Sequence, residues 1–200
     1  MDYVEIIVYL CGMEKEKIVV RVAQKEDAPM IARVVAMAIG DEAGLRGYCG
    51  EEYLAVLMEI ASAEQTQYSY QNTLIAEYEG VVAGAVVGYD GAKLNELRSG
   101  TLSIIEEFTG CIPSIVDETE GGEFYLDSVA VLPRFRGKGV ATALIDAFVE
   151  RAFALGAERV GLIVDKENPD AERLYYSRGF VEVGERMFFS HEMRHLQRAK

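Results

Sequence analysis

A glycine-containing turn between a strand-like segment and a helical segment restricts the fold of this chain more than any other feature of its sequence. It lies within Val131-Leu132-Pro133-Arg134-Phe135-Arg136-Gly137-Lys138-Gly139-Val140-Ala141. Pro133 ends the strand, because proline cannot extend a ladder of hydrogen bonds. Gly137 and Gly139 permit backbone angles that other residues avoid and let a ligand approach the backbone closely. The helix that begins near Val140 points its unpaired N–H groups and its positive dipole end at the same place.

The turn therefore predicts an anion site, and phosphate is the usual occupant of such a site. A stretch of five residues holds three cations, Arg134, Arg136 and Lys138, although the formal net charge of the chain is −13. The alternative is a solvated turn with capping glycines. A Walker A loop is excluded, because it needs serine or threonine after Gly-Lys, and here Gly139 follows Lys138.

A dinucleotide-binding fingerprint is the other phosphate site that the turn resembles. Gly137-x-Gly139 follows a strand, and Asp165 ends the next strand, where a ribose-binding acid would lie. However, Thr142 occupies the position of the third glycine, and only about 60 residues remain after the turn. That length is too short for the full doubly wound sheet of a dinucleotide-binding oxidoreductase.

A second segment carries a recognisable pattern: Asn168-Pro169-Asp170-Ala171-Glu172-Arg173-Leu174-Tyr175-Tyr176-Ser177-Arg178-Gly179-Phe180. Asn168 can cap a helix that has Pro169 at its first position, and Gly179 can end that helix. These local roles do not explain why the segment accompanies the glycine turn in this order and at this distance.

The two segments together resemble the GNAT superfamily of N-acetyltransferases. Its first signature is Arg or Gln, two residues, Gly, one residue, then Gly or Ala, and Arg136-x-x-Gly139-x-Ala141 meets it. The register Arg134-x-x-Gly137-x-Gly139 also fits the bare pattern. The second signature has Asn, Ala three residues later, Leu-Tyr and Gly-Phe, as residues 168–180 do. The likeness extends over about residues 18–190 and is specific over residues 123–180.

The resemblance implies the mixed α/β acyl-CoA N-acyltransferase fold. That fold has a central, mostly antiparallel sheet with one splayed parallel pair of strands, and helices on both faces. It implies one domain at residues 18–200 after an N-terminal extension at residues 1–17. It also implies acetyl-CoA as co-substrate, no metal, and a small-molecule or peptide amine that attacks directly in a ternary complex. A CoA-binding module without acetyl transfer is the alternative, and homodimers are common in the family.

The resemblance assigns the pantetheine arm of CoA to the strand at residues 127–131. Backbone groups of Val129 and Val131 are expected to bind the arm, with Ala130 between them. Asn168 is expected beside the arm on the other side of the cleft. The backbone N–H groups that are expected to cradle the pyrophosphate belong to Arg136, Gly137, Lys138, Gly139, Val140, Ala141 and Thr142.

A primary amine must lose a proton before it attacks a thioester, because an alkyl ammonium has a pKa of about 10. The departing thiolate, whose thiol has a pKa of about 8.5, benefits from a proton donor. The resemblance gives this role to Tyr175, for which a core-facing aromatic is the alternative. Asp127, acting through a water, is the first candidate for the base and Glu123 the second; a surface or capping acid is the alternative for Asp127. Alternation along the strand places Asp127 on one face with Val129 and Val131.

Hydrophobic periodicity and turn residues predict the remaining elements. Strands are expected at residues 18–22, 72–79, 81–89, 123–132, 159–164 and 180–189. Helices are expected at about residues 28–38, 51–63, 140–155 and 169–178. Glu79-Gly80 predicts a hairpin, the glycine-rich residues 40–50 a loop, and residues 90–122 one short helix with a variable loop. Residues 40–70 and 90–122 are the candidate acceptor side.

The negative charge argues against nucleic-acid binding and would draw cationic molecules inward. No apolar run approaches the roughly 20 residues of a membrane span, and Asp2 and Glu5 replace the positive start of a signal peptide. We therefore expect a cytoplasmic protein without nucleic-acid or membrane partners. Cys11, Cys49 and Cys111 show no Cys-x-x-Cys spacing and are expected to be reduced thiols.

The segment His191-Glu192-Met193-Arg194-His195 spells the His-Glu-x-x-His motif of zinc-protease helices. That chemistry needs both histidines one helical turn apart, a third ligand and an open coordination position. Both histidines of the chain are already used here, and five residues follow. We expect no metal site and interpret the segment as the end of the last strand or a terminal tail.

Overall fold

A seven-stranded sheet forms the centre of the molecule. The computed structural model describes residues 17–188 and 191–200, so the predicted extension lies outside it except for Lys17, as does Cys11. The strands are β1 (Ile18–Val22), β2 (Thr73–Tyr78), β3 (Val81–Asp90), β4 (Phe124–Val131), β5 (Arg159–Asp165), β6 (Val181–Phe188) and β7 (His191–Ala199). Their order is β1-β2-β3-β4-β5-β7-β6. β4 and β5 run parallel, and every other neighbouring pair is antiparallel.

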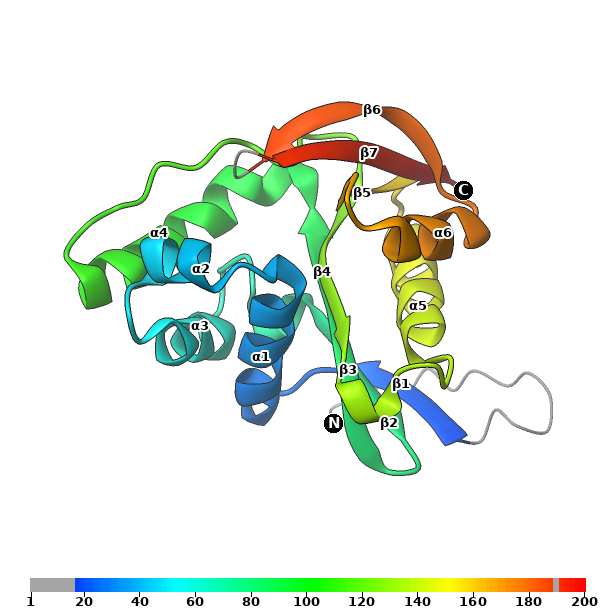
Figure 1. Cartoon of the computed structure of the whole chain (residues 1–200), viewed down its shortest axis with the longest axis horizontal. Coiled ribbons are helices and arrows are strands. Elements are labelled where there is room, and N and C mark those ends of the chain that lie inside the picture. The colour runs from blue at the N-terminus through cyan, green and yellow to red at the C-terminus, as the bar shows by residue number, and fades with distance from the viewer. Residues whose placement is uncertain (1–16, 189–190) are drawn as a thin grey trace.

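Helices cover both faces of this sheet. They are α1 (Ala28–Ile39), α2 (Glu42–Cys49), α3 (Tyr53–Ser62), α4 (Leu94–Thr109), α5 (Val140–Ala154) and α6 (Pro169–Ser177). The first four lie on one side of β4, and α5 and α6 lie on the other (Figure 1). The predicted mixed α/β class, with a mostly antiparallel sheet and one parallel pair, is confirmed. No helix in residues 17–188 and 191–200 is long and apolar enough to cross a bilayer.

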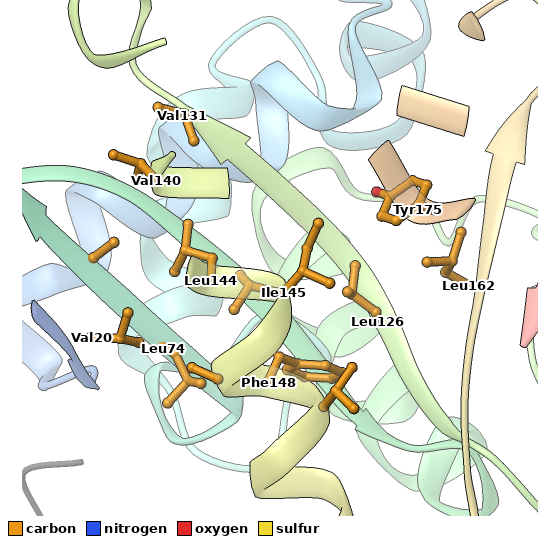
Figure 2. Close-up of a cluster of buried hydrophobic side chains, with 14 of the residues drawn as sticks. Val20, Leu74, Leu126, Val131, Val140, Leu144, Ile145, Phe148, Leu162 and Tyr175 are labelled. Atoms are coloured by element: carbon orange, nitrogen blue, oxygen red, sulfur yellow. The ribbon is translucent and has the colours of Figure 1, made fainter. Parts of the chain in front are cut away.

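Each face of the sheet carries a buried apolar layer. On one face, Leu144, Ile145 and Phe148 of α5 pack against the strands, and none is more than 2% exposed (Figure 2). On the other face, Ile31 of α1 and Leu57 of α3 are fully buried. Burying one such side chain contributes about 1.5–3 kcal/mol. The helices on both faces are therefore held against the sheet, and the loops that join them to the strands begin and end at fixed positions.

The hairpin predicted at Glu79-Gly80 joins β2 to β3. Both turn residues have positive φ, 51° for Glu79 and 76° for Gly80. This is the conformation of a type I′ turn, whose twist matches that of the flanking strands. Glycine adopts it without strain, whereas glutamate does so only because the strands on either side hold it there.

The prediction of a loop at residues 40–50 is wrong, because residues 42–49 form α2. Its glycines cost about 1 kcal/mol each in a helix. Burial of Leu45, Tyr48 and Cys49 outweighs that cost. The helix in residues 90–122 is also longer than predicted, since α4 runs for 16 residues. Gly100 lies within it where a β-carbon would collide with the carbonyl oxygen of Gln65, so this glycine marks close packing and not a turn.

The chain does not end in a tail after the strand predicted at residues 180–189. Residues 191–199 form a further strand, β7, which lies between β5 and β6 and pairs with both. The strand was missed because its sequence, HEMRHLQRA, is mostly polar. Its central residues are nonetheless buried, with Leu196 at 0% and His195 at 8% exposure.

Candidate functional site

The parallel strands β4 and β5 separate almost as soon as they pair. They are joined over two residue rows, Phe124 with Val160 and Tyr125 with Gly161. Beyond these rows the two strands no longer pair and diverge (Figure 1), and the unpaired stretch between them is called the β4–β5 opening below. The splayed pair expected from the sequence is therefore present.

The backbone of β4 faces this opening at alternate residues. The N–H of Leu132 donates to the carbonyl oxygen of Ala83 on β3, at 2.8 Å. In an antiparallel pair, successive residues direct their N–H and C=O groups to opposite sides. Val129 and Val131 therefore direct theirs away from β3 and into the opening, while those of Ala130 point to β3.

The glycine turn lies where β4 ends and α5 begins. Gly137 and Gly139 have φ angles of 72° and 83°, which only glycine adopts readily. A β-carbon at Gly137 would meet no atom of residues 17–188 and 191–200 within 4 Å, so the backbone is open on that side. The first helical hydrogen bond across the turn joins the N–H of Ala143 to the carbonyl oxygen of Gly139, at 3.0 Å. The three preceding helical N–H groups have no intrahelical acceptor, as is usual at a helix start.

The basic side chains of the turn are partly engaged within the protein. The Arg136 guanidinium donates through Nε to the carbonyl oxygen of Val131, at 3.3 Å, and its backbone N–H donates to the carbonyl oxygen of Pro133, at 3.2 Å. The Lys138 ammonium lies 4.6 Å from the centre of the Tyr78 ring. Both cations thus remain beside the turn, where a phosphate would meet them.

Helix α6 approaches the opening from the β5 side. The side-chain oxygen of Asn168 accepts a hydrogen bond from the N–H of Ala171 (3.1 Å), so Asn168 caps the helix as predicted. Tyr175 is 8% exposed, and its ring packs edge-on against Phe180. Figure 2 shows its hydroxyl directed toward β4. Burial raises the pKa of Tyr175 to about 12, so the phenol keeps its proton at neutral pH and is suited to donate it.

A bulge in β4 places Asp127 differently from the prediction. In the pairing of β4 with β3, Ser128 lies opposite Val87 and Leu126 lies opposite Gly88. Asp127, between them, has no partner on β3 and is the extra residue of the bulge. An extra residue reverses the alternation of side chains beyond it. Leu126 and Val129 consequently share the α5 face. Asp127 instead lines a pocket on the α1 face, so its predicted position on one face with Val129 and Val131 is wrong.

The pocket beside Asp127 has a volume of about 370 Å³. The end of α1, the start of α2, Tyr48 and Tyr68 form one wall, and β4, β5 and β7 form the other. Asp41, Glu118, Asp127 and Asp165 line it, and no lysine or arginine is among its described lining residues. The pocket is therefore electronegative with largely apolar walls, which suits a cationic molecule with an apolar body.

Asp127 is the titratable centre of this pocket. Its Oδ1 accepts from the Ser128 hydroxyl at 2.8 Å, and its Oδ2 lies 3.0 Å from the Tyr89 hydroxyl. Burial, and after it the negative charge of Glu118, raises the pKa of Asp127 to about 7. A carboxyl with such a pKa is a competent proton acceptor near neutral pH.

Glu123, the second candidate for the base, does not line this pocket. Its side chain is 2% exposed. Burial alone would raise the pKa of Glu123, but hydrogen bonds from His195, Thr119 and Gln197 lower it. The carboxylate lies 2.8 Å from His195 Nε2 and accepts from Gln197 at 2.7 Å, so it braces the base of β4 against β7.

The His-Glu-x-x-His segment forms a strand and not a helix. Four residues of extended chain span about 13 Å, so His191 and His195 are not one helical turn apart. Each histidine faces a different carboxylate: His191 Nδ1 lies 2.8 Å from Asp165, and His195 contacts Glu123. The zinc-protease geometry is therefore not formed.

Tyr89 and Glu118 contact the Asp127 region and were not predicted from the sequence. They come from β3 and from the loop after α4, and Arg98 of α4 pairs with Glu118. No motif links these segments, which are far apart along the chain. Glu118 could have been predicted only from the path of the loop after α4, which brings Glu118 to Tyr89 of β3.

The model of the acetyltransferase (GNAT) family matches residues 45–180 of this chain. The chain belongs to this family. Among curated proteins it is similar to acetyltransferase Atu2258 of Agrobacterium fabrum, with 30% identity over 111 residues that make up 54% of this chain and 80% of that protein. A solved acetyltransferase crystal structure is 32% identical with a TM-score of 0.77, covering 90% of this chain and 98% of its own. An N-acetyltransferase from Staphylococcus aureus Mu50 is 26% identical with a TM-score of 0.77, covering 89% and 98%.

GNAT membership agrees with the geometry on two points. The family match includes the β4–β5 opening, the glycine turn and Tyr175. The structural likeness extends over nine-tenths of the chain, which is more than the family match covers. The fold that the two sequence segments implied is thus present.

Proposed function

We propose that this GNAT protein transfers the acetyl group of acetyl-CoA to a primary amine by direct attack in a ternary complex. One observation carries the proposal: the β4–β5 opening and the carboxylate-lined pocket meet at Asp127 and Ser128 of β4. A donor in the opening and an acceptor in the pocket would then approach one another across a single strand.

The residues at the opening fit the chemistry of CoA. The outward backbone groups of Val129 and Val131 match an amide-bearing arm such as pantetheine. The N–H groups at the start of α5 match a pyrophosphate, because a helix start attracts anions. Gly137 leaves room for the phosphates to reach the backbone. Arg136 and Lys138 are the cations that would flank them.

The acceptor would enter the pocket as an ammonium ion, drawn by its carboxylates. Asp127 takes one proton, directly or through a water, and the nitrogen lone pair then attacks the thioester carbon. The carbon–nitrogen bond forms, the carbon–sulfur bond breaks, the nitrogen loses its second proton to solvent, and the thiolate takes a proton from Tyr175. Solvent restores the proton of Tyr175, and Asp127 releases its own to solvent.

Release of the CoA thiol, measured with a thiol-reactive dye, tests this proposal. Purified protein is mixed with acetyl-CoA and one amine at a time: a polyamine, an amino acid, an aminoglycoside and a peptide with a free N-terminus. We expect turnover with at least one amine, with the acetylated product seen by mass spectrometry. Tyr175→Phe should lower kcat by about 100-fold, the usual worth of a positioned acid, without weakening CoA binding.

Tyr176→Phe is the matched control, because Tyr176 is the next residue on α6, 41% exposed, and bonded to Glu172. It should leave kcat unchanged. CoA binding without thiol release on any amine, together with no effect of Tyr175→Phe, would instead indicate a CoA-binding module.

A further inference from the structure

The hydroxyl of Tyr89 lies between two carboxyl groups. It is 3.0 Å from Oδ2 of Asp127 and 3.1 Å from Oε1 of Glu118. Gln67 Nε2 donates to the hydroxyl oxygen of Tyr89 at 3.0 Å and occupies one lone pair of that oxygen. A phenol has a single hydrogen to give. If it goes to one carboxylate, the other can bond Tyr89 only by carrying a proton of its own.

The surroundings of the two carboxyls decide which one carries that proton. Arg98 pairs with Oε2 of Glu118, and Gln67 Nε2 donates to Oε1 at 2.9 Å. Burial raises the pKa of Glu118, but the charge of Arg98 and the hydrogen bonds to the carboxylate oppose that rise and favour its ionised form. Asp127 has no such cation bonded to it: the hydrogen bonds that it receives within residues 17–188 and 191–200 come from the Ser128 and Tyr89 hydroxyls. Asp127 is therefore the member of the pair that gains and loses a proton, while Glu118 keeps its negative charge.

We propose that Glu118 is a positioning residue for Asp127. Through the shared hydroxyl of Tyr89, Glu118 holds Asp127 at the pocket and strengthens it as a proton acceptor. When Asp127 is ionised, Tyr89 donates to it; when Asp127 has taken the proton of the amine, Asp127 donates to Tyr89 and Tyr89 donates to Glu118. The hydrogen bond between Tyr89 and Asp127 is kept in both states, whereas the one between Tyr89 and Glu118 forms only in the second. This role rests on the proposed function, in which Asp127 is the base.

The other groups around Asp127 leave Glu118 as the main source of negative charge near it. Burial raises the pKa values of the neighbouring tyrosines, so these remain neutral at working pH. Arg98 is a cation that acts on Asp127, and it is already paired with Glu118 and Asp117. The groups that face Asp127 from the packed elements and the pocket are Tyr48, Tyr68, Tyr89, Tyr125, Arg98, Asp41, Asp165 and His191.

Two substitutions should move the titration of Asp127 in opposite directions. Glu118→Gln keeps the shape of the side chain but removes the like charge, so the pKa of Asp127 should fall by about one pH unit or more. Tyr89→Phe removes a hydrogen bond that favours the ionised form, so the pKa should rise. Opposite shifts separate the proposed role from a general loosening of the fold.

The titration is measured by carbon-13 NMR of carboxyl-labelled aspartate in the full chain, with Asp127→Asn to assign the signal. Glu120→Gln is the matched control, because Glu120 is a mostly exposed acid of the same loop that pairs with Arg186. It should leave the titration unchanged. The acid limb of kcat/KM for thiol release, with the amine found active above, should move to lower pH in Glu118→Gln by the same amount.

The outcomes separate this role from the proposed function. An unchanged Asp127 titration in folded Glu118→Gln protein would overturn the coupling. A shifted titration with an unmoved acid limb would overturn the role of the pair in the reaction, while acetyl transfer stands. Wild-type protein that releases no thiol with any amine would overturn the proposed function itself, and the NMR titration would still decide whether the two carboxyls are coupled.

Discussion

Replacing Asp127 by asparagine should stabilise the protein while it lowers its activity. The pKa of Asp127 is about 7 in the folded protein, against an ordinary value of 3.8. Between these values the folded state binds more protons than the unfolded state, so the free energy of unfolding falls as the pH rises. A difference of roughly three pH units corresponds to a cost of about 4 kcal/mol, fully present above about pH 8.

Asparagine has nearly the same shape and never ionises. Asp127→Asn should therefore be more stable than wild type by up to about 4 kcal/mol at pH 9, and by less than about 1 kcal/mol at pH 4. Loss of the base should lower kcat by about 100-fold. Urea unfolding followed by circular dichroism at pH 4, 6 and 9 measures the first effect.

Glu107→Gln, on the exposed side of α4, is the control for removal of one negative charge. It should show no comparable dependence on pH. The reasoning is refuted if Asp127→Asn is no more stable than wild type at pH 9, or if its advantage is the same at pH 4.

Three further substitutions test the turn, the core and the hairpin. Gly139→Glu should abolish CoA binding in calorimetry, because it strains a backbone whose φ is 83° and places a negative charge at the helix start. Within the described residues its β-carbon meets Ile18 at 3.8 Å, so folded protein with unchanged affinity would contradict the site. Leu144→Ala, at a fully buried position, should lower the free energy of unfolding by about 2–5 kcal/mol in urea, and a loss below about 1 kcal/mol would contradict the packing. Glu79→Asn should raise the melting temperature slightly, since asparagine tolerates its φ of 51°; a lower value would argue against the type I′ turn.

The parts of the fold that depend on neighbouring residues could be predicted from the sequence. Gly137 and Gly139 both have the positive φ that the turn pattern required, and α5 begins at Val140 as expected. The cap by Asn168 and the hairpin at Glu79-Gly80 are equally local. In each case the residue chemistry and the backbone shape are set within a few positions of the chain.

The parts that depend on packing between distant segments could not be predicted. The bulge at Asp127 is defined by the register between β4 and β3, and no residue type within β4 indicates it. The helix α2 forms because its apolar side chains find a buried surface, in spite of Gly44 and Gly47. The Tyr89–Glu118 contact joins β3 to a loop 29 residues away. Sequence periodicity carries no information on such contacts.

The two-row ladder between β4 and β5 divides the sheet into two hydrogen-bonded blocks, β1 to β4 and β5 with β7 and β6. Side-chain packing, and little backbone pairing, holds these blocks to one another. An amide-bearing ligand arm along Val129 and Val131 would add the missing backbone bonds and join the blocks. We therefore expect the two blocks to exchange amide hydrogens as separate cooperative units without ligand, and as one unit once CoA occupies the opening.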